Sequence, residues 1–181
     1  MWFALNPPAI GCILPVPIKL HRFRLPVSQA YLILLVLIAR GNLQNWFWST
    51  PLVALGILWR LWASGVIHKS RAIAKTGPYA LMRHPLYFGS FLIGLGFTSS
   101  ALPHPLYLIL YFALFFAFYF PLMVEEEKKL RDAFPEEYPK YQAQVPRFLP
   151  NFRNSKDLCT GFSWKTVHEN REWRGLLMIL V

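Results

Sequence analysis

Polar side chains able to do chemistry gather in residues 76–90, TGPYALMRHPLYFGS, between two long apolar runs. Pro85 has no backbone N–H and restricts His84 to extended geometry, so we expect a helix to begin at about Pro85. The first turn of a helix carries free N–H groups and a partial positive charge, which favour an anionic group such as a carboxylate. The stretch therefore predicts either an anion site or only an Arg–His collar at the end of a membrane helix.

A second polar group follows the last apolar run, in residues 125–150, which read EEEKKLRDAFPEEYPKYQAQVPRFLP. We expect a charged helix, a turn at Pro135 and a second helical piece. This segment is too short to bury a core of its own, so it must pack on the ends of other helices. Tyr138 and Tyr141 are three residues apart on one helix face, where they either stack on a flat ring or clamp the segment in place.

Three successive carboxylates, Glu125, Glu126 and Glu127, open this second segment. Side chains one residue apart on a helix point about 100° away from each other, so at most two of these carboxylates can share a site. The i,i+4 spacing pairs Glu125 with Lys129 and Glu127 with Arg131, which leaves Glu126 the least neutralised of the three. The alternative is a solvated helix extension without a site.

Composition and apolar runs predict an all-α integral membrane protein. Of the 181 residues, 55% are hydrophobic and only 15% are charged, against about 25% charged in soluble domains. Four apolar runs are expected to span the membrane: 27–39, 46–67, 86–102 and 106–124. Residues 1–124 would then form the membrane region, 125–150 a cytosolic segment that covers a cofactor pocket, and 151–181 a polar tail with a terminal apolar helix.

The formal charge of +10 is unevenly distributed. Basic residues precede the first apolar run and fill the connection between the second and third, so the positive-inside rule puts both termini and the polar segments in the cytosol. Basic residues beside apolar runs favour an anionic membrane surface over nucleic acid. The five histidines and two cysteines lack the spacing of metal ligands, so we expect no metal site.

Two residue types inside the apolar runs need an explanation. Arg60 interrupts the second run, where a charge at membrane depth costs about 2.5–3.5 kcal/mol on insertion scales, so it either faces a cavity or partner or extends toward the cytosolic end. Gly89, Gly94 and Gly96 lie on the third run, where small residues allow close helix packing. Gly89 has the alternative of admitting a ligand.

The pairing of GPYALMRHPLYFGSF with EEEKKLRDAFPEEYPKYQAQVPRFLP resembles the isoprenylcysteine carboxyl methyltransferase family and its phospholipid methyltransferase relatives. The resemblance covers roughly residues 60–150. It implies an integral membrane enzyme that binds S-adenosylmethionine on the cytosolic side and methylates a membrane-associated or lipophilic acceptor. The residues it assigns to the cofactor are Tyr79, Arg83, His84, Pro85, Tyr87, Gly89, Glu126, Glu127, Tyr138 and Tyr141.

The donor's charges suit this assignment. Carboxylates and aromatic faces of the protein favour the sulfonium of the donor. Arg83 favours the carboxylate of the donor. Glu126 and Glu127 are also the expected catalytic pair, because an amine acceptor must lose a proton. Arg60 and Arg147 are the candidates for anchoring the acceptor.

The acceptor itself stays open between a prenylcysteine-like carboxylate and a lipid amine. The stretch FYFPLMV before the acidic run has no basic residue, unlike the prenylcysteine enzymes of the family. Two other functions remain as alternatives: a membrane reductase that resembles the sterol reductases and uses NADPH, and a non-catalytic membrane protein. The last would leave the Arg-His-Pro and acidic groups without a purpose.

Overall fold

The computed structural model describes residues 42–67, 73–102, 104–152, 158 and 160–170. Every regular element in these ranges is a helix, in agreement with the predicted all-α class. The elements are α2 (Leu43–Val66), α3 (Pro78–Leu81), α4 (Pro85–Ala101), α5 (Pro105–Ala133), α6 (Glu137–Gln144) and α7 (Trp164–Glu169). The predicted span at 27–39 and the apolar run at the end of the chain lie outside the described residues.

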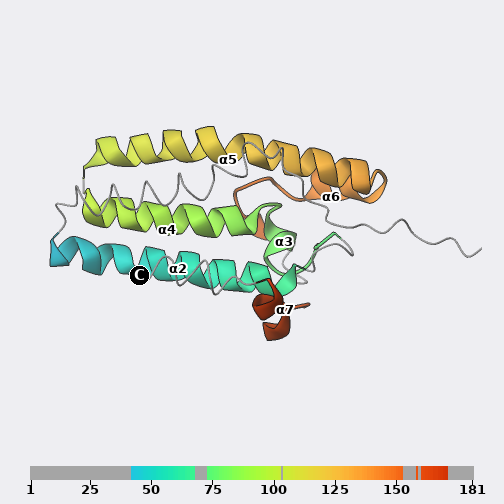
Figure 1. Ribbon diagram of the computed structural model, residues 1–181, viewed down its shortest axis with the longest axis horizontal. Helices are drawn as coiled ribbons and strands as arrows, with labels where there is room; N and C mark the ends of the chain where they lie inside the picture. Colours follow the sequence, from blue (N-terminus) through green and yellow to red (C-terminus); the bar gives the residue numbers. More distant parts are fainter. Residues whose placement is uncertain (1–41, 68–72, 103, 153–157, 159, 171–181) are drawn as a thin grey trace, which may run out of the picture.

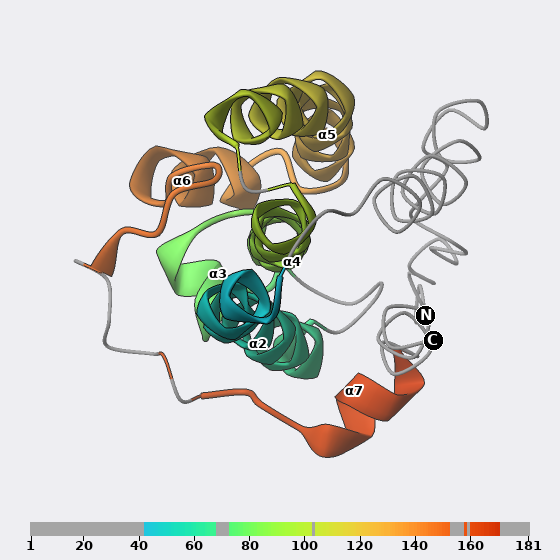
Figure 2. The same cartoon turned by 90° about the vertical axis from the view of Figure 1, so that its left-hand side faces the viewer.

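Three long helices lie side by side, with α4 between α2 and α5 (Figures 1 and 2). The chain reverses direction between α4 and α5, so the start of α4 lies beside the end of α5. The beginning of α4 at Pro85 confirms the helix start predicted from the proline. The predicted runs 46–67 and 86–102 are thus helices, and their crossing of a membrane remains a prediction.

Glycines bring α2 and α4 into close contact. A Cβ added to Gly89 would lie 2.5 Å from Cγ of Arg60 and 2.9 Å from the carbonyl oxygen of Gly56. A Cβ at Gly56 would lie 2.8 Å from the carbonyl oxygen of Gly89, and one at Gly96 would lie 2.5 Å from Cγ2 of Val53. Such small-residue contacts are typical of helices packed within a membrane. The predicted packing role is confirmed for Gly89 and Gly96, and also for Gly94, where an added Cβ would lie 2.4 Å from the Tyr111 hydroxyl of α5.

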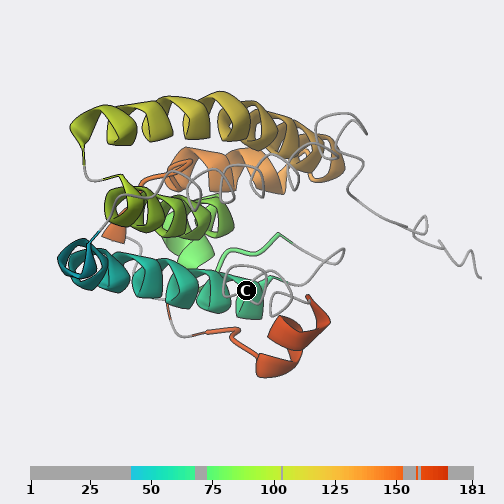
Figure 3. The same ribbon diagram turned by 60° about the vertical axis from the view of Figure 1, so that its left-hand side comes forward.

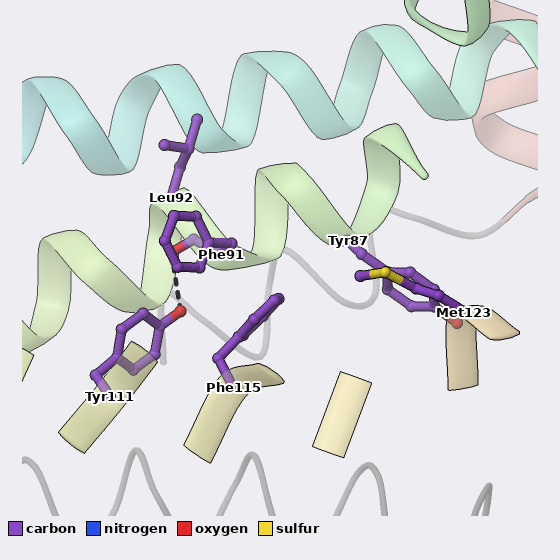
Figure 4. Packing of buried hydrophobic residues seen from close by; sticks show 6 residues of the cluster. All are labelled: Tyr87, Phe91, Leu92, Tyr111, Phe115 and Met123. Carbon is purple, nitrogen blue, oxygen red and sulfur yellow. Dashed lines mark hydrogen bonds between the residues drawn. The ribbon is translucent and has the colours of Figure 1, made fainter. Parts of the chain in front are cut away.

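Aromatic side chains fill the contact between α4 and α5. Phe91 of α4 packs against Tyr111 and Phe115 of α5, and the Tyr111 hydroxyl donates to the Phe91 carbonyl oxygen over 2.8 Å (Figure 4). Phe148, which follows α6, adds its ring to this cluster, 5.5 Å from that of Phe91 between centroids. Edge-to-face and offset pairs of this kind stabilise beyond their buried area. Phe148 therefore fastens the segment after α6 onto the helical bundle.

Helix α5 is the described helix whose length and apolar composition suit a membrane crossing. Only 22% of its most apolar window is buried, so most of that surface is available to lipid. Its 29 residues extend about 43 Å at 1.5 Å per residue, well beyond a hydrocarbon core of about 30 Å. The apolar part ends at Val124, as predicted, and the acidic run continues the same helix outside the apolar segment.

The shorter helices gather at one end of the bundle (Figure 3). Helix α3 precedes the start of α4, α6 lies against the last turns of α5, and α7 lies against the end of α2. Gly77 precedes α3 with a φ of 59°, a left-handed conformation that suits glycine, and Pro78 begins the helix. All polar segments singled out in the sequence therefore meet at this end.

Candidate functional site

The buried carboxylate of Glu127 is the centre of a polar network at this end. Its Oε2 lies 2.8 Å from Nη1 of Arg83, and its Oε1 lies 3.1 Å from Nε2 of His84. Arg147 donates from Nε to Oε1 over 2.8 Å and from Nη2 to Oε2 over 2.9 Å, a bidentate pair. Nε2 of Gln142 lies 3.4 Å from Oε2. One carboxylate thus joins α5, the start of α4, α6 and the segment that follows α6.

These partners keep Glu127 ionised, although its side chain is only 3% exposed. Burial by itself raises the pKa of this carboxyl group, which lies beyond the apolar part of α5. Hydrogen bonds from His84 and Arg147, together with the charge of Arg83, outweigh burial and hold the pKa of Glu127 well below its usual range. Because its acceptor sites are occupied, Glu127 positions its neighbours and has little capacity left for a ligand.

Glu126 is the accessible member of the acidic pair, with 22% of its side chain exposed. It accepts a hydrogen bond from the Tyr87 hydroxyl, and its Oε2 lies 3.7 Å from Nδ1 of His84. The His84 ring, which stacks on Tyr87, therefore lies between the carboxylates of Glu126 and Glu127. The prediction that Glu126 is the least neutralised of the three glutamates agrees with these contacts.

The segment after α6 returns along the start of α4 and is held by backbone hydrogen bonds. The N–H groups of Arg83 and His84 donate to the carbonyl oxygens of Pro146 and Arg147, over 2.9 and 3.2 Å. Further along, the N–H of Asn151 donates to the carbonyl oxygen of Leu81 over 2.9 Å. The Arg-His-Pro stretch is therefore fixed through its main chain as well as through its side chains.

The two predicted tyrosines of α6 are both buried against this stretch. The Tyr141 hydroxyl donates to the Tyr79 carbonyl oxygen over 2.7 Å, which ties α6 to α3. The ring centroids of Tyr138 and Tyr141 lie 5.9 Å apart. Burial raises the pKa of Tyr141, and hydrogen bonding to Glu127 raises that of Arg147. In this arrangement Tyr141 acts as the clamp of the two roles predicted for the tyrosines.

Three buried donor atoms in the network have no hydrogen-bond partner of good geometry among the described residues: Nε and Nη1 of Arg83 and the hydroxyl of Tyr138. Of these, Nη1 of Arg83 still forms the ion pair with Glu127. Arg83 is 10% exposed and Tyr138 is 1% exposed. Burial raises the pKa of Tyr138 to about 12, with the charge of Glu127 adding to the shift and Arg83 opposing it. Unpaired buried donors are costly, so an anionic ligand that accepted from them would be stabilised.

Three predicted residues lie elsewhere or in a supporting role. Gly89 faces Arg60 and Gly56 in the contact between α2 and α4, so protein fills the space beside it. Arg60 donates from Nη1 to Ser90 Oγ, and the same nitrogen lies 3.5 Å from the Leu86 carbonyl oxygen. Pro85 is buried at the first turn of α4.

The local ion pairs were predicted with mixed success. Lys129 pairs with Glu125 over 3.0 Å, as the i,i+4 spacing predicts. The predicted pair of Glu127 with Arg131 is wrong, because Glu127 turns inward to the network and Arg131 donates to Gln142 over 2.9 Å. Gln142 and Phe148 were missed altogether. Their importance comes from contacts with distant segments, which periodicity within the chain does not reveal.

Comparisons with known proteins agree with the resemblance found in the sequence. The family described as "Phospholipid methyltransferase" matches residues 32–137, well over half of the chain. The "Cobalt-zinc-cadmium resistance protein CzcN" of Cupriavidus metallidurans is 34% identical over 134 residues, 67% of this chain and 58% of the relative. The "Nickel-cobalt-cadmium resistance protein NccN" of Alcaligenes xylosoxydans xylosoxydans is 30% identical over 158 residues, 79% of this chain and 72% of the relative.

A third relative carries an enzyme name. The "Protein-S-isoprenylcysteine O-methyltransferase" of Xenopus laevis is 34% identical over 87 residues, which are 48% of this chain and 30% of that protein. The chain therefore spans less than two thirds of the length of this relative and of the cobalt-zinc-cadmium protein. No solved structure matches. The family match extends over both the Arg-His-Pro stretch and the acidic run, so this chain belongs to the phospholipid methyltransferase family.

Proposed function

We propose that the protein is an S-adenosylmethionine-dependent integral membrane methyltransferase that acts on a membrane-associated or lipophilic acceptor. The observation that carries the proposal is the convergence of both family-like segments on Glu127, at the end of the bundle where the apolar part of α5 stops. This location puts polar, ionised groups beside the region from which a lipid-borne acceptor would arrive.

The polar groups of the network fit the methyl donor. Arg83 and Tyr138 would hold the donor's carboxylate, because both have a buried donor without a hydrogen-bond partner in the described part of the chain. Glu126 would face the cationic groups, because it is the exposed carboxylate of the pair. When bound, S-adenosylmethionine supplies an electrophilic methyl group. Glu127 would position Arg83, His84 and Arg147 without touching the donor.

The chain's own contribution to the reaction would be mainly orientation and proton removal. A carboxylate acceptor needs no base. An amine acceptor must lose a proton, and Glu126, with His84 close to it, would take that proton. The remaining residues of the expected cofactor set, Tyr79 and Tyr87, would shape the site through their contacts with Tyr141 and Glu126.

The acceptor remains either a prenylcysteine-like carboxylate or a lipid amine. The name of the Xenopus relative supports a carboxylate acceptor, and the chain covers 30% of that protein. Arg147 donates to Glu127 through Nε and Nη2, so its proposed part in acceptor binding would be mainly indirect. Arg60, on α2 beside the start of α4, is the proposed direct anchor.

Calorimetric titration of the purified protein with S-adenosylhomocysteine and with NADPH tests the proposal. We expect S-adenosylhomocysteine to bind and NADPH not to bind, because the family match supports a methyltransferase and not the reductase. Binding of NADPH alone would refute the methyltransferase. Glu126→Ala and His84→Ala should each lower the affinity for S-adenosylhomocysteine. Unchanged affinity in both variants would mean that the methyl donor binds at another site.

A further inference from the structure

Exposed aromatic side chains lie at two levels along α2. Residues 46–48, Trp-Phe-Trp, are exposed near its beginning, and Phe162 and Trp164 are exposed beside its end. The Phe162 ring packs against Gly65, where an added Cβ would lie 2.3 Å from it. Trp46 and Gly65 are 19 positions apart, about 28 Å along a helix, and a hydrocarbon core is about 30 Å thick. Tryptophan is enriched at both surfaces of such a core.

Helix α7 is fastened to the end of α2, so Trp164 is held at a defined height. Nδ2 of Asn170 donates to the carbonyl oxygens of Ser64 and Ile67, over 2.8 and 3.0 Å. These carbonyls belong to the last turn and the cap of α2, where no helical partner exists for them. Val167 of α7 is buried, whereas Trp164 is 69% exposed.

The described basic residues concentrate at the same end of the bundle. Residues 42–59 and 84–124 contain no lysine or arginine. The exposed cations in the described ranges are Lys75, Lys128, Arg131, Lys140 and Lys165. Lys165 is on α7 itself, next to Trp164. Basic side chains next to apolar surface are attracted to anionic lipid headgroups, with about 1 kcal/mol for each cation near the membrane.

We propose that Phe162 and α7 form a membrane-interface anchor, with Trp164 in the headgroup layer of an anionic leaflet. Residues 46–48 occupy the opposite interface. The anchor lies at the end of the bundle where α5 ends (Figure 3), and Glu126 and Glu127 belong to the last turns of α5. It therefore fixes the height of the polar network relative to the lipid headgroups. The occupant of this surface is lipid, and neither a second copy of the chain nor another protein is needed to cover it.

Nitroxide depth measurements test the anchor in the full chain. Trp164→Cys would be spin-labelled in a chain with Cys12→Ser and Cys159→Ser, in nanodiscs containing phosphatidylglycerol. The rates at which the spin label collides with oxygen and with a water-soluble nickel complex report the depth of the label in the bilayer. Labels at Leu114, halfway along the apolar part of α5, and at exposed Glu136 serve as hydrocarbon and water controls. We expect the label at 164 to lie between the two, and values equal to those at 136 would overturn the proposal.

Photo-crosslinking gives a second test that leaves both native cysteines in place. A benzophenone amino acid at position 164 should form adducts with phospholipid, detected by mass spectrometry after digestion. The same group at position 136 should form none. The anchor would be refuted if position 164 formed no adduct with lipid and instead formed one with another protein chain or with a segment of the same chain. That partner would then be the occupant of the surface.

Discussion

At the scale of single residues, Glu127 concentrates the charge interactions of the network in one side chain. Two arginines and a histidine approach its two oxygens, and its burial excludes water from these contacts. Removing one partner of a buried ion pair leaves the others uncompensated and costs about 3–5 kcal/mol. The stability of this end of the bundle therefore depends on Glu127 far more than on the other two glutamates.

Glu127→Gln should lower the free energy of unfolding by about 3 kcal/mol, because Arg83 would keep its buried charge without a carboxylate. Thermal unfolding in detergent, followed by circular dichroism, measures the change. Glu125→Gln is the matched control, because it removes a partly exposed i,i+4 pair with Lys129 worth less than about 1 kcal/mol. Equal effects of the two substitutions would show that the inward contacts of Glu127 do not stabilise the fold.

Tyr138→Phe should have opposite effects on stability and on binding. In the free protein it deletes a buried hydroxyl without a hydrogen-bond partner in the described residues, so unfolding stability should stay the same or rise by about 1 kcal/mol. If that hydroxyl donates to the carboxylate of the methyl donor, affinity for S-adenosylhomocysteine should fall about tenfold, as expected for about 1.4 kcal/mol.

An analogue of S-adenosylhomocysteine that lacks the carboxylate provides the control for this substitution. Calorimetry should find its affinity equal for the original protein and for Tyr138→Phe. A similar loss for both ligands would mean that Tyr138 acts through the shape of the site and not through a bond to the carboxylate.

At this scale the sequence predicted the types of the important residues better than their partners. The Arg-His-Pro stretch, Glu126, Glu127 and Tyr141 meet at one end of the bundle, as the resemblance implied. The partner of Glu127 was predicted incorrectly from i,i+4 spacing, because a buried contact with Arg147 outweighs a solvated contact with Arg131.

At the scale of elements, the contact between α2 and α4 depends on the absence of side chains at glycine positions. Gly89→Ala should lower the free energy of unfolding by about 1–3 kcal/mol, because its Cβ would meet the Gly56 backbone at 2.9 Å and Arg60 at 2.5 Å. Thermal unfolding of Ser99→Ala, also on α4, gives the control, with an expected change below about 0.5 kcal/mol. An equally small change for Gly89→Ala would mean that α2 and α4 can move apart with little loss of stability.

Helix boundaries followed the prolines closely. Pro85 and Pro105 each begin a helix in the described chain, since proline suits the first turn. Two short helices, α3 and α7, were not predicted. Neither has enough residues for a periodic pattern, and α7 is held in place by contacts of Asn170 with α2, some hundred positions earlier in the chain.

At the scale of the whole molecule, the distribution of charge predicts how the protein lies in the membrane. Every described lysine and arginine is at or near the end of the bundle with the polar network, and residues 42–59 and 84–124 have none. The positive-inside rule assigns the basic end to the cytosol. The network would then face cytosolic supplies of the methyl donor.

Cysteine labelling in intact cells tests this orientation. In a chain with Cys12→Ser and Cys159→Ser, a membrane-impermeant maleimide added outside should label Gln44→Cys and leave Lys128→Cys unlabelled until the cells are opened. Both positions are exposed, and they lie at opposite ends of the bundle. Labelling of Lys128→Cys from outside would reverse the orientation and place the network away from the cytosol.

The backbone contact between Arg83 and Pro146 joins residues 63 positions apart in the chain. Closing a loop of that length costs entropy that neither segment recovers alone, so the contact depends on the surrounding packing. During synthesis, α2, α4 and α5 leave the ribosome before Arg147, Phe148 and Asn151 do. The newly made chain therefore passes through a stage with its long helices in place and Glu127 without its bidentate partner. The polar network is completed only when the residues after α6 have been added.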